Sequence, residues 1–265
     1  MWREADVYSG VDAAASPPRA VAAIALNSRP MSIWRWIGEA AEGGAGALGA
    51  LLAWTGGIFA GIRDPATRRQ VAFSIALIAL SAKMAKADGV VTSSEIAAFR
   101  NIFAMPASEE RNVVRLFDLA KRDVAGYDSY ASRIASLYAN ERDSLVDVLD
   151  GLFFIAKADG AVHEAEFAYL ESVAEIFGLE GPAFQRIAAR HVVGPEGDPY
   201  AVLGVDRAWP FDEIRAQYRK LVSENHPDRF IARGMPPDFI AIANDRLAAI
   251  NRAWEEVERN RAAMG

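Results

Sequence analysis

The tripeptide His226-Pro227-Asp228 is the strongest candidate for chemistry in this 265-residue chain. It directly follows an amphipathic stretch, 213–224, that carries Arg215, Arg219 and Lys220. Proline disfavours the α conformation in the residue before it, so the pattern predicts that a helix closes at His226 and that a tight turn presents the histidine and the carboxylate. A solvated carboxylate beside a basic helix can form charge-assisted pairs with a partner. The predicted chemistry is therefore docking. Each feature alone also fits a helix-end histidine or a solvated basic face, and only their order favours docking.

A second helix is predicted after this turn, because apolar residues recur there at alternating three- and four-residue steps. We expect Ile214, Tyr218 and Leu221 of the basic helix to pack against it, so that two antiparallel helices frame the turn. The apolar positions of the second helix are Ile240, Ala243, Leu247, Ile250, Trp254 and Val257.

The order of these motifs resembles the J-domain family. The matching segments are 198–205, 214–221, 226–229 and 249–255. The resemblance implies a co-chaperone that docks on a DnaK-type heat-shock ATPase, stimulates its ATP hydrolysis and performs no catalysis itself. No cofactor is required for that role. The residues implied in partner binding are Arg215, Arg219, Lys220 and Arg229 on the basic face and His226, Pro227 and Asp228 in the loop.

An internal repeat forms the second constellation: 85–91, AKADGVV, recurs as 156–162, AKADGAV. Asp88 and Glu95 in the first copy correspond to Asp159 and Glu166 in the second. Oxygen ligands around a turn suit a hard divalent cation such as calcium, although the spacing is not that of an EF-hand. The alternative is a plain helix-joining turn, with glycine in a left-handed conformation and a polar residue capping the next helix.

The repeat region resembles the TerB-like (tellurite-resistance) helical domain, in which acidic turn residues are suspected of metal binding. Apolar helical runs on both sides of each Asp-Gly turn predict an all-α fold, a two-fold repeated TerB-like helical bundle followed by a C-terminal J-domain helical hairpin. In the DjlA subfamily of J-domain proteins, a TerB-like domain precedes a C-terminal J domain behind a glycine-rich membrane segment, and this chain resembles that arrangement.

Composition shifts divide the chain into a disordered lead at 1–30, a Gly/Ala-rich apolar segment at 31–66, a TerB-like domain at 67–193 and a J domain at 194–265. Residues 43–62 carry no charge, and small residues recur in them every fourth position, as in packed membrane helices. Basic residues follow, so the expected location is cytoplasmic, with an inner-membrane anchor as one option. The alternatives are a flexible Gly/Ala-rich linker and a soluble amphipathic hairpin, and a start at Met31 stays open.

Bulk properties exclude several classes of function. A net charge of −6 argues against nucleic-acid binding, and the absence of cysteine excludes disulfides and thiolate metal sites. No nucleophile or phosphate-loop motif indicates an enzyme. The leading hypothesis is a DnaJ-type co-chaperone whose TerB-like domain provides targeting or sensing. The alternative is a metal- or stress-responsive interaction protein with a non-functional J-like tail, and a homodimer is left open.

Overall fold

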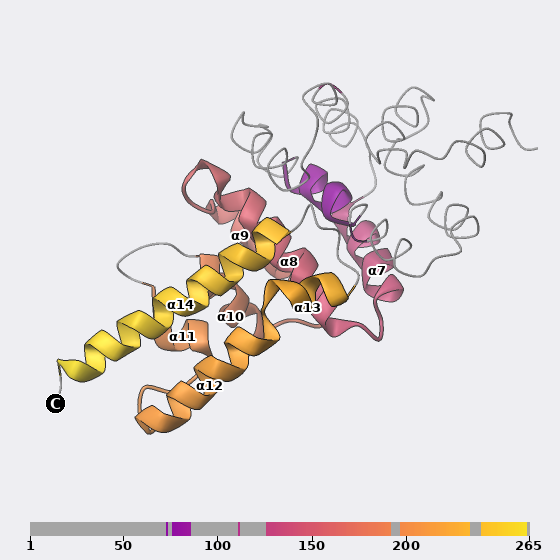
Figure 1. Cartoon of the computed structure of the whole chain (residues 1–265). Helices are drawn as coiled ribbons and strands as arrows, with labels where there is room; N and C mark the ends of the chain where they lie inside the picture. The colour runs from indigo at the N-terminus through magenta and orange to yellow at the C-terminus, as the bar shows by residue number, and fades with distance from the viewer. Residues whose placement is uncertain are drawn as a thin grey trace, which may run out of the picture. The chain divides into compact units, whose positions relative to one another are not determined.

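The computed structural model describes residues 73, 76–85, 111, 126–191, 197–233 and 240–263. Every regular element in this part of the chain is helical and none is a strand, so the predicted all-α class is confirmed. Residues 76–85 are helical. The elements that follow are α7 (Tyr127–Leu137), α8 (Arg142–Ala156), the 3₁₀ turn η3 (Lys157–Asp159), α9 (Glu164–Ile176), α10 (Pro182–His191), α11 (Pro199–Leu203), α12 (Phe211–Glu224), α13 (Pro227–Ala232) and α14 (Ile240–Ala262) (Figure 1).

The predictions for residues 1–66, including the apolar segment 43–62, lie outside the described residues, as does the first copy of the repeat after residue 85. Of the three predicted boundaries, only the one between residues 193 and 194 lies between two described helices. There, α10 ends at His191 and α11 begins at Pro199.

The second copy of the repeat forms a helix-joining turn between α8 and α9. Gly160 adopts φ +117° at the end of η3, a conformation that favours glycine. The next helix opens with a capping interaction, because the His163 backbone N–H donates to Glu166 Oε2 at 2.9 Å. The turn geometry predicted as the alternative to a metal loop is therefore present here, with glutamate as the capping residue.

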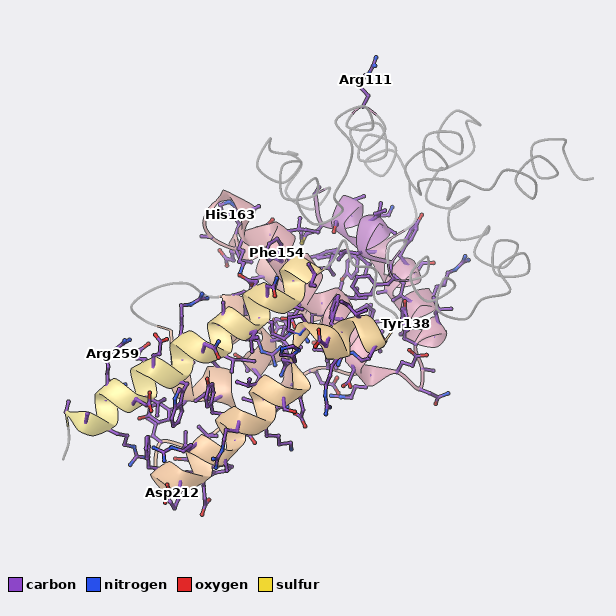
Figure 2. All side chains as sticks on the ribbon, in the orientation of Figure 1. Arg111, Tyr138, Phe154, His163, Asp212 and Arg259 are labelled. Atoms are coloured by element: carbon purple, nitrogen blue, oxygen red, sulfur yellow. The ribbon has the colours of Figure 1, made fainter. Side chains whose placement is uncertain are left out.

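The core of the J-domain hairpin lies where α11, α12 and α14 meet. Ile214 and Ile250 are fully buried, and Trp254 stacks on the ring of Tyr218 at 4.8 Å between centroids. Phe211 stacks on the same indole at 5.4 Å. In Figure 2, Asp212 marks the start of α12 and Arg259 lies near the end of α14. The two helices pack together as predicted, but two positions of the predicted stripe on α14 are not buried: Ile240 is exposed and Leu247 is only half-buried.

A second core, built by helix 76–85 and α7 to α10, includes residues from the J domain. Phe230 of α13 is buried in it and meets Phe73 edge to face at 6.3 Å. Ile242 and Ala243 of α14 are buried in the same cluster. A Cβ atom at Gly151 of α8 would lie 3.0 Å from Ile242 Cδ1, so the glycine permits the close approach of α14 to α8. The two domains therefore share one apolar core.

The expected attachment to a membrane is not supported. Across the described ranges, no helix is both long and apolar enough to cross a bilayer. The longest, α14, has 23 residues but carries many charged side chains, and α8 has 15, fewer than the roughly 20 that a span requires.

Replacing Phe230 by alanine tests the shared core. We expect Phe230→Ala to lower the free energy of unfolding by about 3–5 kcal/mol, because it leaves a cavity where a fully buried ring packed. The neighbouring Ile231 is 43% exposed, and Ile231→Ala should change stability by less than about 0.5 kcal/mol. Urea denaturation of both variants measures the difference. Equal effects would show that α13 does not contribute to the core.

Candidate partner-docking site

The His-Pro-Asp loop joins α12 to α13. The last residue of α12 is Glu224, and the Asn225 backbone N–H still donates to Leu221 O at 2.9 Å. His226 is extended, with φ −64° and ψ 138°, as expected before proline. However, the prediction that His226 closes a helix on a tight turn is wrong. Pro227 occupies the first position of α13, where its missing N–H costs nothing, so His226 begins the next helix.

The loop holds its own geometry through one local contact. The Asp228 backbone N–H donates to His226 Nδ1 at 3.2 Å, so the histidine side chain caps α13. The side chain of Asp228 is 87% exposed, and that of His226 is 51% exposed. The loop thus presents an accessible carboxylate on a fixed backbone.

The four predicted cationic residues are all exposed, three of them on α12 and one on α13. Arg215 and Arg219 are one turn apart, and the Arg215 guanidinium lies 4.9 Å from the centre of the Phe211 ring. Lys220 faces a cleft beside α10 and lies 3.9 Å from Glu224. Arg229, on α13, lines the same cleft and is exposed. The structure therefore brings the loop and the basic residues onto adjoining surfaces.

Of the four predicted metal ligands, only Glu166 has a described side chain. Asp88 and Glu95 lie outside them, and the side chain of Asp159 is not described. Glu166 is buried, and its carboxylate accepts the capping hydrogen bond from His163. Within the described part of the chain, no three His, Asp or Glu side chains form a group able to hold an ion. The divalent cation stays a prediction.

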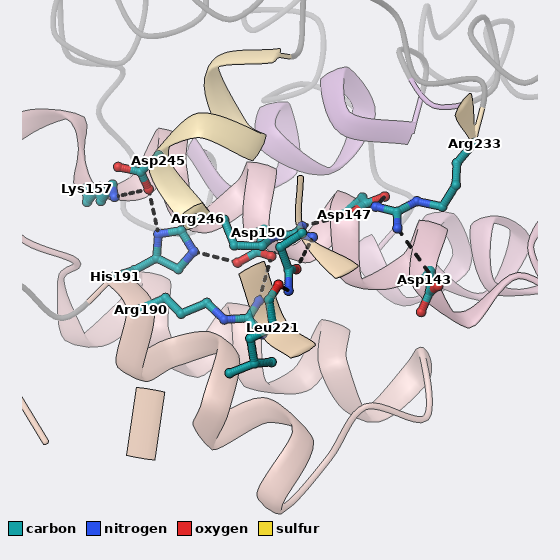
Figure 3. A network of polar contacts seen from close by, with 11 residues as sticks. Asp143, Asp147, Asp150, Lys157, Arg190, His191, Leu221, Arg233, Asp245 and Arg246 are labelled. Carbon is teal, nitrogen blue, oxygen red and sulfur yellow. Dashed lines mark hydrogen bonds and ion pairs between the residues drawn. The ribbon is translucent and has the colours of Figure 1, made fainter. Parts of the chain in front are cut away.

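Sequence reasoning missed a buried ion network between the two domains (Figure 3). Asp147 and Asp150 on α8 have no exposed side-chain surface. Arg246 of α14, only 4% exposed, pairs with both carboxylates, and its Nη2 donates to Asp147 Oδ1 at 2.7 Å. Arg233, directly after α13, donates to Asp147 Oδ2 at 3.0 Å. Two carboxylates of the TerB-like half are thus neutralised by two arginines of the J domain.

The far end of the network reaches α10. Asp150 also accepts from Arg190 at 3.1 Å and from His191 Nε2 at 2.7 Å. His191 Nδ1 lies 3.8 Å from Asp245, which is too long for a hydrogen bond. Asp245 of α14 instead pairs with Lys157 at 2.6 Å. Ion pairs and hydrogen bonds therefore connect α8 with α10 and α14, and α14 with the turn after α8.

Burial and charge set the protonation of this network. Burial raises the pKa of Asp147, and Arg246 and Arg233 only partly offset that rise. Burial also acts upward on Asp150, but Arg246, Arg190 and His191 together outweigh it and lower its pKa. Burial lowers the pKa of His191 more than its hydrogen bond to Asp150 raises it. Burial is therefore the main reason why this environment favours the neutral form of the imidazole.

A sequence signal for the network existed in the apolar run of α8. Asp147 and Asp150 are three residues apart and lie among Leu145, Val148, Leu149 and Leu152, so they fall on the buried side of the helix. A carboxylate on such a face requires a cation. Arg246 likewise stands beside the apolar stripe of α14.

Removing the Arg246 side chain should destabilise the contact between the two domains. We expect Arg246→Met to lower the free energy of unfolding by about 3–5 kcal/mol, because two buried carboxylates lose a common cation. Arg252→Met, an exposed site on the same helix, is the control and should change stability by under about 0.5 kcal/mol. Chemical denaturation checks both. A loss for Arg246→Met no larger than that of the control would contradict the network's role.

Acidification should weaken the same interface. The folded-state pKa of His191 lies below its ordinary value of 6.5. The stability it contributes is therefore present above about pH 6.5 and is lost as the pH falls toward the folded-state pKa, where the unfolded chain binds the extra proton. Between about pH 7.5 and about pH 5.5, the melting temperature of the wild type should fall more steeply than that of His191→Gln.

Calorimetry at matched ionic strength measures this pH slope. The control is Arg252→Met, which changes an exposed residue of α14 outside the network and should retain the wild-type slope. Parallel curves for wild type and His191→Gln would rule out His191 as the titrating group.

Comparison with known proteins agrees with this division of the chain. Residues 74–189 match the family model described as tellurite resistance protein TerB, and residues 198–261 match the DnaJ domain. Relatives named Co-chaperone protein DjlA also match. The one from Coxiella burnetii is 27% identical over 201 residues, covering 68% of this chain and 74% of the relative. The one from Photobacterium profundum is 26% identical over 240 residues, covering 78% and 86%.

A third relative of that name, from Vibrio cholerae, is 24% identical over 228 residues, covering 73% of this chain and 79% of its own. No solved structure matches the chain significantly. The two family matches occur in the order, and at the positions, of the two helical units described above. The chain therefore consists of a TerB domain followed by a C-terminal DnaJ domain, and over most of its length it is similar to proteins named Co-chaperone protein DjlA.

Proposed function

We propose that this DnaJ-type co-chaperone docks on a DnaK-type ATPase through α12 and the His-Pro-Asp loop, and that it stimulates ATP hydrolysis by that partner. One observation carries the proposal: Asp228 is fixed by its backbone contact to His226, yet its carboxylate stays in solvent. A carboxylate held in this way can pair with a cation of the partner without reorganising first.

The basic residues on either side of the loop suit the docking step. Arg215, Arg219 and Lys220 extend along α12, and Arg229 follows on α13. Exposed cations attract an acidic partner surface over a distance and increase the rate of encounter. We assign the basic residues to docking and the loop, His226 to Asp228, to the stimulating contact.

The TerB domain then serves targeting or sensing, because the shared core fixes it to the J domain. The relatives are named as co-chaperones, so chemistry on a substrate is assigned to the ATPase and not to this chain. The alternative is a metal- or stress-responsive protein with a non-functional J-like tail. No group of metal ligands among the described residues supports it.

Steady-state ATP hydrolysis by a DnaK-type partner tests the proposal. We expect wild-type protein to stimulate hydrolysis and Asp228→Asn to abolish the stimulation, because the amide carries no charge to pair with a partner cation. The exposed position makes a stability change above about 0.5 kcal/mol unexpected. The control Asp212→Asn makes the same chemical change at the exposed start of α12 and should stimulate like wild type. Equal stimulation by wild type and Asp228→Asn would refute the assignment.

A further inference from the structure

A cleft of about 450 Å³ lies between the TerB domain and the J domain. Its lining comes from α8 and α10 on one side and from α11 to α14 on the other. Seven of the lining residues are Lys or Arg and three are Asp or Glu, so the cleft has an excess of positive charge in a chain whose net charge is negative.

The acidic groups in the lining are already engaged. Asp147 pairs with Arg246 and Arg233, and Asp143 lies 4.0 Å from the latter. Glu224 lies 3.9 Å from Lys220. Lys220 thus has an acidic neighbour, whereas none of these three carboxylates forms an ion pair with Arg142, Arg186 or Arg229.

Two arginines of the TerB domain stand at that mouth. Arg186 of α10 is exposed, and no hydrogen bond or ion pair joins its side chain to another described residue. Its stem lies against Gly204, where an added Cβ would come within 2.7 Å of Arg186 Cδ. Arg142, the first residue of α8, is exposed and donates to Gly178 O at 2.7 Å. Because Gly204 has no side chain, Arg186 of the TerB domain can pack against the end of α11, the first helix of the J domain.

The same mouth is lined by Lys220 and Arg229, two of the residues assigned to partner docking. The basic surface of the J domain is therefore continuous with Arg142 and Arg186 of the TerB domain. The buried network at Arg246 and the shared core hold the two sides in one arrangement. A partner that covers Lys220 and Arg229 would meet α10 at the same time.

We propose that Arg142 and Arg186 form part of the docking surface for the ATPase, so that an acidic face of that partner contacts both domains at once. This inference rests on the proposed function. A protein surface is favoured over a small phosphate ion, because Arg142, Arg186, Lys220 and Arg229 are all exposed and belong to four different helices. They spread over a surface and do not enclose a point.

The test compares the full-length protein with charge-reversal variants in the partner's ATPase assay. Arg186→Glu and Arg142→Glu should each raise the concentration for half-maximal stimulation by about two- to fivefold, the range of an exposed ion pair. Maximal stimulation should be unchanged, because the loop is intact. Added salt should narrow the difference from wild type, since it screens surface charges. Arg133→Glu makes the same change on α7, outside the cleft, and should leave the half-maximal concentration unaltered.

The outcomes separate this inference from the function on which it rests. If Asp228→Asn abolishes stimulation and Arg186→Glu behaves like Arg133→Glu, the function stands and the composite surface is refuted. A lower half-maximal concentration for Arg186→Glu would show that α10 obstructs the partner, which also refutes it. Thermal stabilisation by inorganic phosphate that is lost in Arg186→Glu, with stimulation unaltered, would assign the cleft to a small anion instead.

Discussion

Two carboxylates on the buried side of α8 require cations inside the protein, because an ionised group left unpaired in a core is costly. Asp147 and Asp150 obtain their shared cation from Arg246, a residue of the J domain. The TerB domain supplies Arg190 and His191 to Asp150, but both arginines that pair with Asp147 come from the J domain. This requirement fixes α14 against α8, and the position of α14 determines where the remaining J-domain elements lie.

The docking loop inherits its position from that constraint. Asp147 also binds Arg233, the residue directly after α13, and Phe230 on the same helix enters the core. His226 caps the N-terminus of α13, a helix of six residues whose C-terminal end is anchored in the interior. The loop is therefore held close to the interior by this short helix. The loop stays in solvent while the elements that carry it are anchored on both sides.

Periodicity predicted the helical hairpin well, because the stripe containing Ile250 and Trp254 reports directly which side of α14 is buried. The extended backbone of His226 was equally predictable from Pro227. The short helix α13 was not, since six residues are too few for a repeating pattern. The ion network escaped prediction for another reason: Arg246 and Asp147 are 99 residues apart, and a buried face does not reveal what it meets. The metal prediction depended partly on Asp88 and Glu95, and the membrane prediction on residues 43–62, all of which lie outside the described residues.

The shared interior limits how freely these two modules can be exchanged during evolution. A J domain taken from an unrelated protein and joined after the TerB domain would keep its own hairpin and its own loop. Without arginines at the positions of Arg233 and Arg246 and an aromatic ring at the position of Phe230, it would leave Asp147 without a cation and would leave a cavity in the core. Recombination at the boundary should therefore succeed only between chains that preserve these residues together, and the pair would be inherited as a single unit.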